Sequence, residues 1–595
     1  MKLLRLKITD PKGFRSLQSG FEYCFRSEWD LQEEQGFTPF VCAGPNGSGK
    51  SNLLEALTAI FYHLECTYLD NLPDSFRYDY DTNPGGFSSK KAIPAGFEIE
   101  YLVNPQNALK VKGHNGLAHI FIVKEPGEAL EWFLLNHDEQ DSVVDLSVGQ
   151  TLARQLLPDY ILGYSSGENE ILSLPFFKMR FVQFDEYWQA LKDQLPYPGR
   201  PESRLVYLDS GFSQAILLCN LLFHDTEVLK PFQEDVKIEE LKEFRLIIRR
   251  SIGVTRDVAE GFGTGEYGTG GFGRGGFATG NPAIIADQES DSYKLNLMQL
   301  LEANESSADN FNPIVTRLKR CATCWYIDET SDSLYLDYYV NEATRNAFRK
   351  NFDFDVHNSP IELFHAFQVL LTLNLYSVSD ALKADLYQSN SHYVSEAIPS
   401  LAADERIMRI EFVRFYKTDV PEPVMLKSLS DGEHQLLHTL GLCLLFKNTS
   451  SLFLLDEPET HFNPDWRANF ITRLRESFNG NEDHEMLITT HTPFLISDSK
   501  PEKVLSFKKK DGTVSVSNPD YNTLGASINK ITMATFGKRE TIGGHAQTIL
   551  TELRQRFEQG EDKQKVIAEI NRRLGDSVEK MLLIKTILDS VEAQD

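Results

Sequence analysis

The sequence predicts an α/β fold whose central domain is assembled from the two ends of the chain. Near the N-terminus, the apolar stretch Phe40–Ala43 is followed by the glycine-rich octet Gly44–Ser51 and by a helical pattern over Asn52–Glu65. Far downstream, the apolar run Phe453–Leu455 ends in two carboxylates. Short apolar strands that lead into turns and amphipathic helices are typical of α/β domains.

The octet Gly44–Ser51 fits the pattern G-x-x-x-x-G-K-[ST] of a phosphate-binding loop at every fixed position. Its glycines let backbone N–H groups turn toward phosphates, and the following helix offers its positive N-terminal end. We expect Lys50 to reach the outer phosphates of a nucleoside triphosphate and Ser51 to supply a hydroxyl ligand for Mg²⁺. The predicted nucleotide-binding residues of this segment are Asn46, Gly47, Gly49, Lys50, Ser51 and Asn52.

Two acidic side chains and a histidine follow strands near the other end of the chain. Phe453–Leu455 leads into Asp456 and Glu457, an arrangement that can hold Mg²⁺ and place a base beside it. We assign Asp456 to the metal and Glu457 to the attacking water. The strand Leu487–Thr490 ends at His491, a candidate contact of the γ-phosphate.

A helix start suited to a phosphate lies upstream of the acidic pair. The segment Leu429–Gln435 opens a helical run, so its backbone N–H groups lie at a helix N-terminus. Ser430, Gly432 and Glu433 are the predicted binding residues there. Lys50 is far from this segment in sequence, so a large insertion divides one site into two halves.

In this combination the chain resembles the ABC-type ATPase heads of the SMC, RecF and OLD group. Gly44–Ser51 matches the Walker A loop, Leu429–Gln435 the signature motif, Leu454–Glu457 the Walker B strand and His491 the switch histidine. The resemblance implies an α/β P-loop head that binds and hydrolyses ATP with Mg²⁺. The spacing of the motifs and the apolar periodicity of the chain indicate that a mostly helical insertion splits this head and that a helical extension follows it.

Two further residues are assigned by the resemblance alone. Arg15, in the segment Gly13–Leu17, corresponds to an arginine that such heads carry near the nucleotide. Gln183, in the apolar run Phe181–Phe184, is the candidate for a Mg²⁺-sensing glutamine, and the alternative for it is a surface residue of a strand. Asp431 departs from the pattern, because transporters usually carry glycine at this position of the signature.

The resemblance also implies self-association. In this group the signature serine of one subunit faces the phosphate loop of another, so ATP is sandwiched between two heads. We therefore expect a homodimer or higher oligomer with ATP at the interface. Hydrolysis removes the γ-phosphate and should weaken this contact.

The split head, the mid-sized insertion without heptads and the short C-terminal extension look like PtuA-type ATPases. These are the ATPase subunits of Septu anti-phage systems and of retron systems that carry an HNH nuclease. The resemblance implies a regulatory ATPase that restrains a separate nuclease subunit, because no nuclease motif stands out in this chain. Two alternatives remain: a RecF- or SMC-like DNA-repair or DNA-end-sensing ATPase that acts directly on DNA, and an ATP-gated scaffold with very slow turnover.

Composition bounds the class of protein. The chain has 595 residues, 41% of them hydrophobic, and a formal net charge of −26. Its seven cysteines are too sparse and irregular for a disulfide framework, and no apolar run reaches the ~20 residues of a membrane helix. We expect a cytoplasmic protein with no membrane contact.

The net negative charge argues against nucleic-acid binding over the whole surface of the protein, so any contact with DNA or RNA must be local. The alternative for each basic cluster is a solvated helix face. The candidate clusters are Arg245, Arg249, Arg250 and Arg256; Arg317, Lys319 and Arg320; and Lys538 with Arg539.

Helical spacing of apolar residues dominates the insertion, whereas two earlier segments, Gly96–Val103 and Ala118–Val123, alternate like strands. The glycine-rich tract 261–280 predicts a flexible loop. Cys321 and Cys324 form a C-x-x-C pair, for which buried or surface cysteines are favoured over metal ligands. The helices predicted in the insertion are Ser213–Phe223, Ile238–Ile252, Tyr293–Ala303 and Pro360–Leu375.

These patterns divide the chain into four parts. Residues 1–190 form the N-terminal ATPase lobe, and residues 191–400 the mostly helical insertion. Residues 401–520 form the C-terminal ATPase lobe with the signature, Walker B and switch histidine. Residues 521–595 form a helical extension, which is either a docking or dimerization element or a cap on the head.

Overall fold

The structure is a computed structural model of the chain. It describes residues 1–34, 36–105, 108–138, 143–166, 172–193, 201–207, 209–263, 283–286, 293–302, 313–353, 359–391, 398–478, 484–537 and 542–589. Lys538, Arg539 and most of the glycine-rich tract 261–280 lie outside the described residues.

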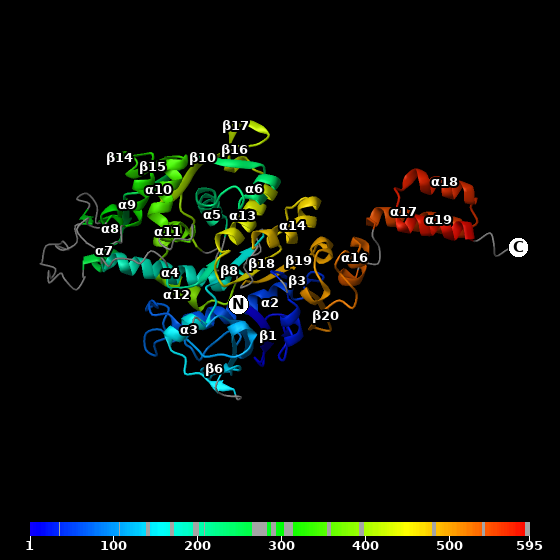
Figure 1. The fold of residues 1–595 in the computed structure, drawn as a ribbon, viewed down its shortest axis with the longest axis horizontal. Helices are drawn as coiled ribbons and strands as arrows, with labels where there is room; N and C mark the ends of the chain where they lie inside the picture. Colours follow the sequence, from blue (N-terminus) through cyan, green and yellow to red (C-terminus); the bar gives the residue numbers. More distant parts are fainter. Residues whose placement is uncertain are drawn as a thin grey trace.

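A seven-stranded sheet forms the centre of the molecule (Figure 1). Its strands are β3 (Phe40–Ala43), β8 (Tyr160–Ser165), β9 (Leu205–Tyr207), β18 (Ser451–Asp456), β19 (Glu485–Thr490), β20 (Val504–Lys510) and β21 (Thr513–Ser517). They lie in the order β21-β20-β3-β19-β18-β8-β9, and every neighbouring pair is parallel except β20 and β21. Because β3 pairs with β19 on one side and β20 on the other, both of its neighbours come from the far end of the chain. The predicted α/β fold, assembled from both ends of the chain, is confirmed.

Each face of this sheet packs on a separate hydrophobic core. In β3, Phe40 and Cys42 belong to one buried cluster, whereas Val41 and Ala43 belong to the other. Side chains on a strand alternate between its faces, so a strand covered on both sides reads as a continuous apolar run. This explains why the central strands were visible in the sequence.

Helices cover the two faces. The apolar side of α2 (Lys50–Tyr68) packs into the core that contains Phe40, together with part of α4 (Ser173–Lys192). On the other face, α5 (Ser210–Phe223) and α13 (Asp431–Leu445) join the second core. The remaining helices near the head are α1 (Glu28–Glu33), α3 (Gln150–Leu156), α6 (Lys230–Asp235), α14 (Pro464–Ser477), α15 (Pro493–Ser497) and α16 (Ile528–Phe536).

An antiparallel sheet of six strands lies below the central sheet in Figure 1. Its strands are β1 (Lys2–Ile8), β2 (Glu22–Cys24), β4 (Phe97–Val103), β5 (Ala118–Lys124), β6 (Leu130–Leu134) and β7 (Val144–Asp145), in the order β2-β1-β4-β5-β6-β7. The two alternating segments predicted as strands are β4 and β5, so these predictions are confirmed.

The insertion contributes a second antiparallel sheet, above the central one in Figure 1. Its strands are β10 (Ile238–Arg249), β14 (Cys324–Asp328), β15 (Ser333–Tyr339), β16 (Met408–Lys417) and β17 (Val420–Met425). They lie in the order β14-β15-β10-β16-β17, so strands from both sides of the expected boundary at residue 400 share one sheet.

The rest of the insertion combines short strands with helices. A small sheet holds β11 (Ser251–Val254), β12 (Ile284–Ala286) and β13 (Tyr293–Asn296). The helices are α7 (Arg256–Gly263), α8 (Leu297–Leu301), α9 (Ile314–Cys321), α10 (Glu342–Phe352), α11 (Ile361–Thr372) and α12 (Asp380–Gln388).

Two of the helices predicted in the insertion are wrong. Ile238–Ile252 is mostly strand β10, in which the alternate side chains Phe244, Leu246 and Ile248 all belong to the large core. Pairing with β15 and β16 on both sides overrides the local helical spacing, because strand pairing depends on distant residues. Tyr293–Ala303 begins with strand β13 and becomes helical only in α8. The helices predicted at Ser213–Phe223 and Pro360–Leu375 correspond to α5 and α11 and are confirmed.

Among the described residues, no single helix is long and apolar enough to cross a membrane. One bent pair, Ile361–Ser377 with Asp380–Gln388, passes the test of length and composition when its two parts are taken together. Most of α11, the first part of this pair, is buried in the protein core.

The C-terminal helical extension predicted from the sequence is confirmed, and it has two parts. Helix α16 belongs to the head, because Ile531 is fully buried in the large core. Three later helices, α17 (Gly544–Glu558), α18 (Lys563–Arg573) and α19 (Val578–Asp589), enclose a small core of their own and lie apart from the head in Figure 1. The buried residues of this core are Leu550, Leu553, Val566, Ile570, Leu583 and Ile587.

Removing residues 538–595 should leave the stability of the head unchanged. The deleted helices pack on one another, whereas α16 and Ile531 stay in place. Urea unfolding of the shortened chain should give the midpoint of the full-length protein. Ile531→Ala in the full chain is the contrasting variant and should lose about 2–5 kcal/mol. A lower midpoint for the shortened chain would show that α17–α19 support the head.

Candidate functional site

The glycine-rich loop between β3 and α2 has the backbone that its sequence predicts. Gly44, Gly47 and Gly49 have φ values of 150°, 72° and 102°, which side-chain-bearing residues rarely adopt. At Gly44 a Cβ atom would lie 2.5 Å from the carbonyl oxygen of Phe507 on β20. The loop therefore follows a path that depends on a strand from the opposite end of the chain.

Lys50, the first residue of α2, folds back over this loop. Its Nζ lies 3.1 Å from the carbonyl oxygen of Gly44, 3.3 Å from that of Pro45 and 3.2 Å from His491 Nε2. Burial lowers the pKa of Lys50, while the nearby carboxylates of Glu457 and Asp456 act in the opposite direction. The amine is thus held at the carboxyl end of β3, where anionic oxygens would be its preferred partners.

The two halves of the site meet at Ser51 and Asp456. Ser51 Oγ donates to Asp456 Oδ1 at 2.8 Å, and Thr489 Oγ1 on the neighbouring strand donates to the same oxygen at 2.5 Å. Burial raises the pKa of Asp456, although these two hydrogen bonds oppose the effect. A hydroxyl and a carboxylate in contact are oxygen ligands of the kind that Mg²⁺ prefers, so this pair fits a magnesium site.

Glu457 and His491 form the second polar pair. His491 Nε2 lies 2.7 Å from Glu457 Oε1, and this hydrogen bond is the main cause that lowers the pKa of Glu457. The backbone of Glu457 has φ 51°, a left-handed conformation that is strained for a residue with a side chain. Its N–H donates to Thr489 Oγ1 at 3.1 Å, which holds the turn in place. The hydrogen bond to His491 therefore favours the ionised form of Glu457.

These side chains line one open cavity of about 280 Å³. The phosphate loop supplies one wall, and the acidic and histidine side chains from the far end of the chain supply the other. The lining residues are Asn46, Gly47, Gly49, Lys50, Ser51, Asn52, Glu457 and His491. The structure thus brings together the predicted residues of the first segment and two of the predicted residues of the last.

Arg15 lies beside this cavity but not in its lining. It has φ 54°, and its guanidinium pairs with Glu55 on α2, with an Nη2 to Oε1 distance of 2.8 Å. The adjacent Ser16 Oγ donates to Asn52 Oδ1 at 2.6 Å. The loop of Arg15 therefore contacts α2 twice, through Ser16 at Asn52 just after the phosphate loop and through Arg15 at Glu55.

The predicted signature residues lie at the start of α13, outside the lining of the cavity. Ser430 Oγ accepts a hydrogen bond from the Glu433 N–H, and Glu433 Oε2 accepts one from the Ser430 N–H at 2.8 Å. This reciprocal capping box stabilises the helix N-terminus. Gly432 is needed because a Cβ atom would lie 2.7 Å from the carbonyl oxygen of His461. Ser430 and Asp431 are exposed, so this helix start is available to another molecule.

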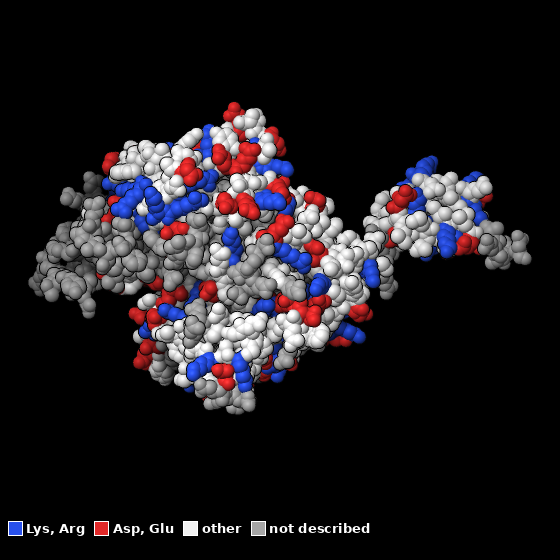
Figure 2. All heavy atoms as spheres, viewed as in Figure 1, with Lys and Arg blue, Asp and Glu red and all other residues white. Residues whose placement is uncertain are grey.

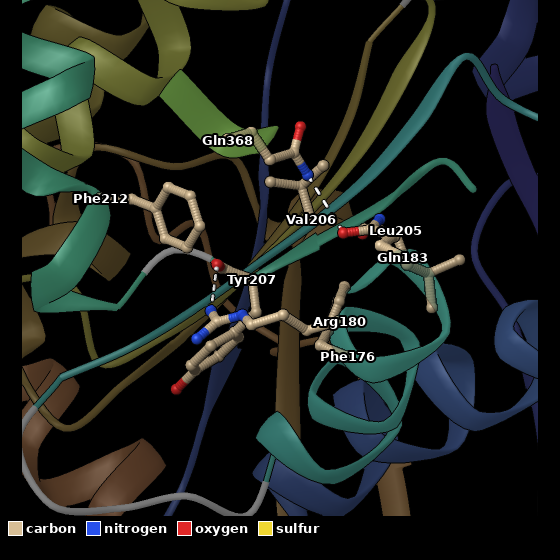
Figure 3. Close-up of a pocket in the computed structure, with 8 residues that line it drawn as sticks. All are labelled: Phe176, Arg180, Gln183, Leu205, Val206, Tyr207, Phe212 and Gln368. Carbon is tan, nitrogen blue, oxygen red and sulfur yellow. Dashed lines mark hydrogen bonds between the residues drawn. The ribbon is translucent and has the colours of Figure 1, made fainter. Parts of the chain in front are cut away.

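The prediction that Gln183 lies on a strand is wrong, and the structure does not bring Gln183 to the phosphate loop. It is buried on α4, where its amide donates to the carbonyl oxygen of Leu205 at 3.4 Å and accepts from Gln368 at 3.3 Å. Figure 3 shows it beside Gln368 and Arg180 at a cavity of about 10 Å³, the size of one water molecule. The apolar run that suggested a strand is one side of a buried helix.

The structure adds three residues that the sequence did not single out. Thr489 bridges Asp456 and Glu457. Thr490 Oγ1 donates to Glu459, and it also accepts from the N–H of Thr492 at 3.0 Å, which fixes the turn that carries His491. Glu459 is only 4% exposed, and burial raises its pKa to about 7. The sequence does show an acid two residues after Glu457, but it does not show that the side chain of this acid is buried against Thr490.

The C-x-x-C pair does not form a joint site. Cys321 is buried at the end of α9 and its pKa is raised to about 12 by burial, whereas Cys324 is exposed on β14. Within the described residues, no group of three or more His, Cys, Asp or Glu side chains could hold a metal ion.

Comparison with known proteins supports part of this description. Residues 299–497 match a family described as "AAA domain, putative AbiEii toxin, Type IV TA system". Protein ea59 of Escherichia phage lambda is 23% identical over 129 residues, which are 21% of this chain and 24% of that protein. The chain thus matches about a quarter of the length of this curated relative.

Solved structures similar to this chain include SMC heads. The SmcHead bound to the C-winged helix domain of ScpA has a TM-score of 0.30 and 10% identity, over 87% of this chain and 98% of that one. The SMC head domain from Thermotoga maritima has a TM-score of 0.29 and 12% identity, over 88% and 100% of the two chains. At these TM-scores the likeness does not define the fold of this chain.

The matched family range contains α13, β18, β19 and His491. These elements carry the proposed signature residues, Asp456 and Glu457, and the histidine of the cavity, so the match to a family described as an AAA domain covers the second half of the site. The phosphate loop lies before the matched range and meets it at the cavity, where Lys50 and Ser51 lie with Glu457 and His491.

Glu459→Gln should remove a pH dependence of stability. The folded protein raises the pKa of Glu459 from 4.5 to about 7, so it holds a proton that the unfolded chain releases. This contribution to stability is present at low pH and is lost as the pH rises toward 7. Relative to the wild type, the variant should gain on the order of 3 kcal/mol between about pH 4.5 and pH 7.

Urea unfolding of both proteins across this pH range measures the effect. Glu558→Gln, at an exposed position of α17, is the matched control and should track the wild type. A constant difference between Glu459→Gln and the wild type would contradict the raised pKa.

Proposed function

We propose that the chain binds ATP with Mg²⁺ in the cavity at the phosphate loop and hydrolyses it. The observation that carries this proposal is the cavity itself, which Lys50 and Ser51 share with Glu457 and His491 from the opposite end of the chain. The backbone N–H groups around Gly47 and Gly49 would bind the phosphates, and Asn46 and Asn52 would flank them. Lys50 would exchange its carbonyl contacts for the outer phosphates.

Ser51 and Asp456 would hold Mg²⁺, because their oxygens already meet at 2.8 Å. When bound, this ion neutralises charge on the transferring phosphoryl group. Glu457 is kept ionised by His491 and can accept a proton from water. His491 lies between Glu457 and Lys50, so it can contact the terminal phosphate while orienting the base.

We further propose that a second copy of the chain completes the site. Ser430 is exposed at the start of α13, Glu433 is half-buried behind it and Gly432 is buried, and in one chain this helix start is not part of the cavity. A bound triphosphate would attract the helix N-terminus of another copy. ATP would then join two heads, and hydrolysis would weaken their contact.

The role we propose is that of a regulatory ATPase in an anti-phage defence complex, which acts in the cytoplasm and controls a separate HNH nuclease. Its support is the likeness of the motifs and of their organisation to PtuA-type ATPases, together with the family match, whose description names a toxin of a TA system. The helices α17–α19 are the candidate docking element for the nuclease. Helix α19 exposes the apolar side chains of Met581, Leu582 and Leu588, which a partner could cover.

Glu457→Gln should retain ATP binding but hydrolyse ATP at least about a hundredfold more slowly, because the proton acceptor is lost. Isothermal titration and phosphate release measure the two properties, and mass measurement with ATP should show a trapped dimer. Lys50→Ala is the comparison variant that should lose nucleotide binding, while Lys509→Ala, at an exposed lysine of β20, should behave as wild type. Normal turnover by Glu457→Gln would place the base elsewhere.

The purified chain should not cut DNA in the presence of Mg²⁺, because the proposed cutting activity belongs to a partner. A tagged chain expressed with its neighbouring reading frames should capture a nuclease, and mass spectrometry identifies it. The chain ending at residue 537 is the control, since it lacks the proposed docking element. Cleavage by the chain alone, or equal capture by both forms, would contradict this arrangement.

A further inference from the structure

Two neighbouring helices of the insertion concentrate positive charge in an acidic protein. Helix α9 carries Arg317, Lys319 and Arg320 with no acidic residue, and α10 carries Arg345, Arg349 and Lys350 with one acid, Glu342. The whole chain has 60 basic and 86 acidic residues, so this balance is reversed locally. Figure 2 shows Lys and Arg side chains gathered at the upper left, over α9 and α10. We call these six basic residues, with Trp325, the α9–α10 surface.

The two helices form one surface because Arg317 joins them. Its Nη1 donates to the carbonyl oxygen of Asn351 at 3.3 Å, and its guanidinium lies 4.6 Å from the ring centroid of Phe352. Arg317 is mostly buried by these contacts. The other basic side chains of the two helices therefore share one rigid support.

Carboxylates offset only part of this charge: Glu362 acts on Arg317, and Glu240 and Glu342 act on Arg345. Arg349 donates to the carbonyl oxygen of Phe223 at 3.1 Å, and Arg345 to that of Leu221, both at the end of α5. Lys319 pairs with Glu302. For the exposed Arg320 and Lys350, the part of the chain that the structure describes contains no ion pair.

The other basic cluster predicted from the sequence differs in this respect. Arg245 pairs with Asp337, Arg250 with Glu329 at 2.9 Å and Arg256 with Glu260 at 2.9 Å. Arg249, the fourth member, donates to the carbonyl oxygens of Ser251 and Asp404. Three of the four charges in this cluster thus have carboxylate partners, whereas the α9–α10 surface keeps more of its charge for anionic oxygens. Lys538 and Arg539 lie outside the described residues.

An exposed aromatic ring borders the same surface. Trp325 is 49% exposed at the start of β14, and Lys319 Nζ lies 4.6 Å from its ring centroid. An aromatic ring beside basic side chains is the arrangement on which unpaired bases stack while the backbone is bound electrostatically. A base inside a duplex cannot reach such a ring.

From the unbalanced charge and the adjacent ring, we propose that the α9–α10 surface binds single-stranded nucleic acid. Arg320 and Lys350 contact phosphates, with Lys319, Arg345 and Arg349 adding to the positive field. Trp325 stacks on a base. An acidic protein partner would match the charge but would gain nothing specific from the ring. This surface is separate from the ATP cavity, so the inference does not rest on the proposed ATPase activity.

The test is the binding of fluorescein-labelled strands of about 20 nucleotides, one of DNA and one of RNA, measured by anisotropy without nucleotide. Arg320→Glu with Lys350→Glu should weaken binding at least tenfold at low salt. It should also reduce the slope of log affinity against log salt by about 1.4, since two phosphate contacts are lost. Lys565→Glu with Arg572→Glu, at exposed positions of α18, makes the same charge change and should stay within twofold of wild type.

Trp325→Ala should weaken binding about tenfold without changing the salt slope, because stacking releases no counterions. Arg320→Ala with Lys350→Ala is the milder second variant, and thermal unfolding checks that each protein is folded. The proposal is overturned if the wild type binds neither strand, or if the α9–α10 variants bind like the α18 control. It is also overturned if a duplex binds as tightly as the single strands, or if poly-glutamate displaces them equally well.

Discussion

The whole arrangement depends on the parallel pairing of β3 with strands from the other end of the chain. This pairing places the carboxyl ends of β3, β18 and β19 at one edge of the sheet, so the phosphate loop meets the acidic residues there. The hydrogen bond from Ser51 to Asp456 joins residues 405 positions apart and is the direct result. Without this sheet, the phosphate loop would lack the nearby carboxylate and histidine, and these two side chains would lack the loop.

Within the cavity, basic and acidic side chains lie in direct contact or close to one another. Lys50 and His491 lie among Glu457, Asp456 and the loop carbonyl oxygens, and several of these groups are buried. Lys50 and His491 can exchange these protein partners for the oxygens of a phosphate, because both can donate hydrogen bonds to anionic oxygens. The exposed helix start at Ser430 stands outside this group. The site is therefore well formed for phosphate chemistry on one side and open to a second molecule on the other.

The sequence predicted the parts of the fold whose signals are local. The octet at Gly44–Ser51, the acid pair and the buried strands could be read because each has a fixed spacing or a continuous apolar run. The strand at Ile238–Arg249 could not, because its pairing on both sides depends on residues far along the chain. The position of Gln183 could not be predicted either, because a short apolar run does not distinguish a buried helix from a strand. The roles of Thr489 and Glu459 follow from contacts across the strand ends, which no local pattern records.

The position of β3 has a consequence for synthesis on the ribosome. Both edges of β3 are covered only by β19 and β20, which end at Thr490 and Lys510. During translation, β3 therefore waits with two unpaired edges until the strands that end at Thr490 and Lys510 have been made. Unpaired edges of an apolar strand are prone to wrong pairing. The delay favours a holding chaperone, or rapid shielding of β3 by α2 and the six-stranded sheet, until the last strands emerge.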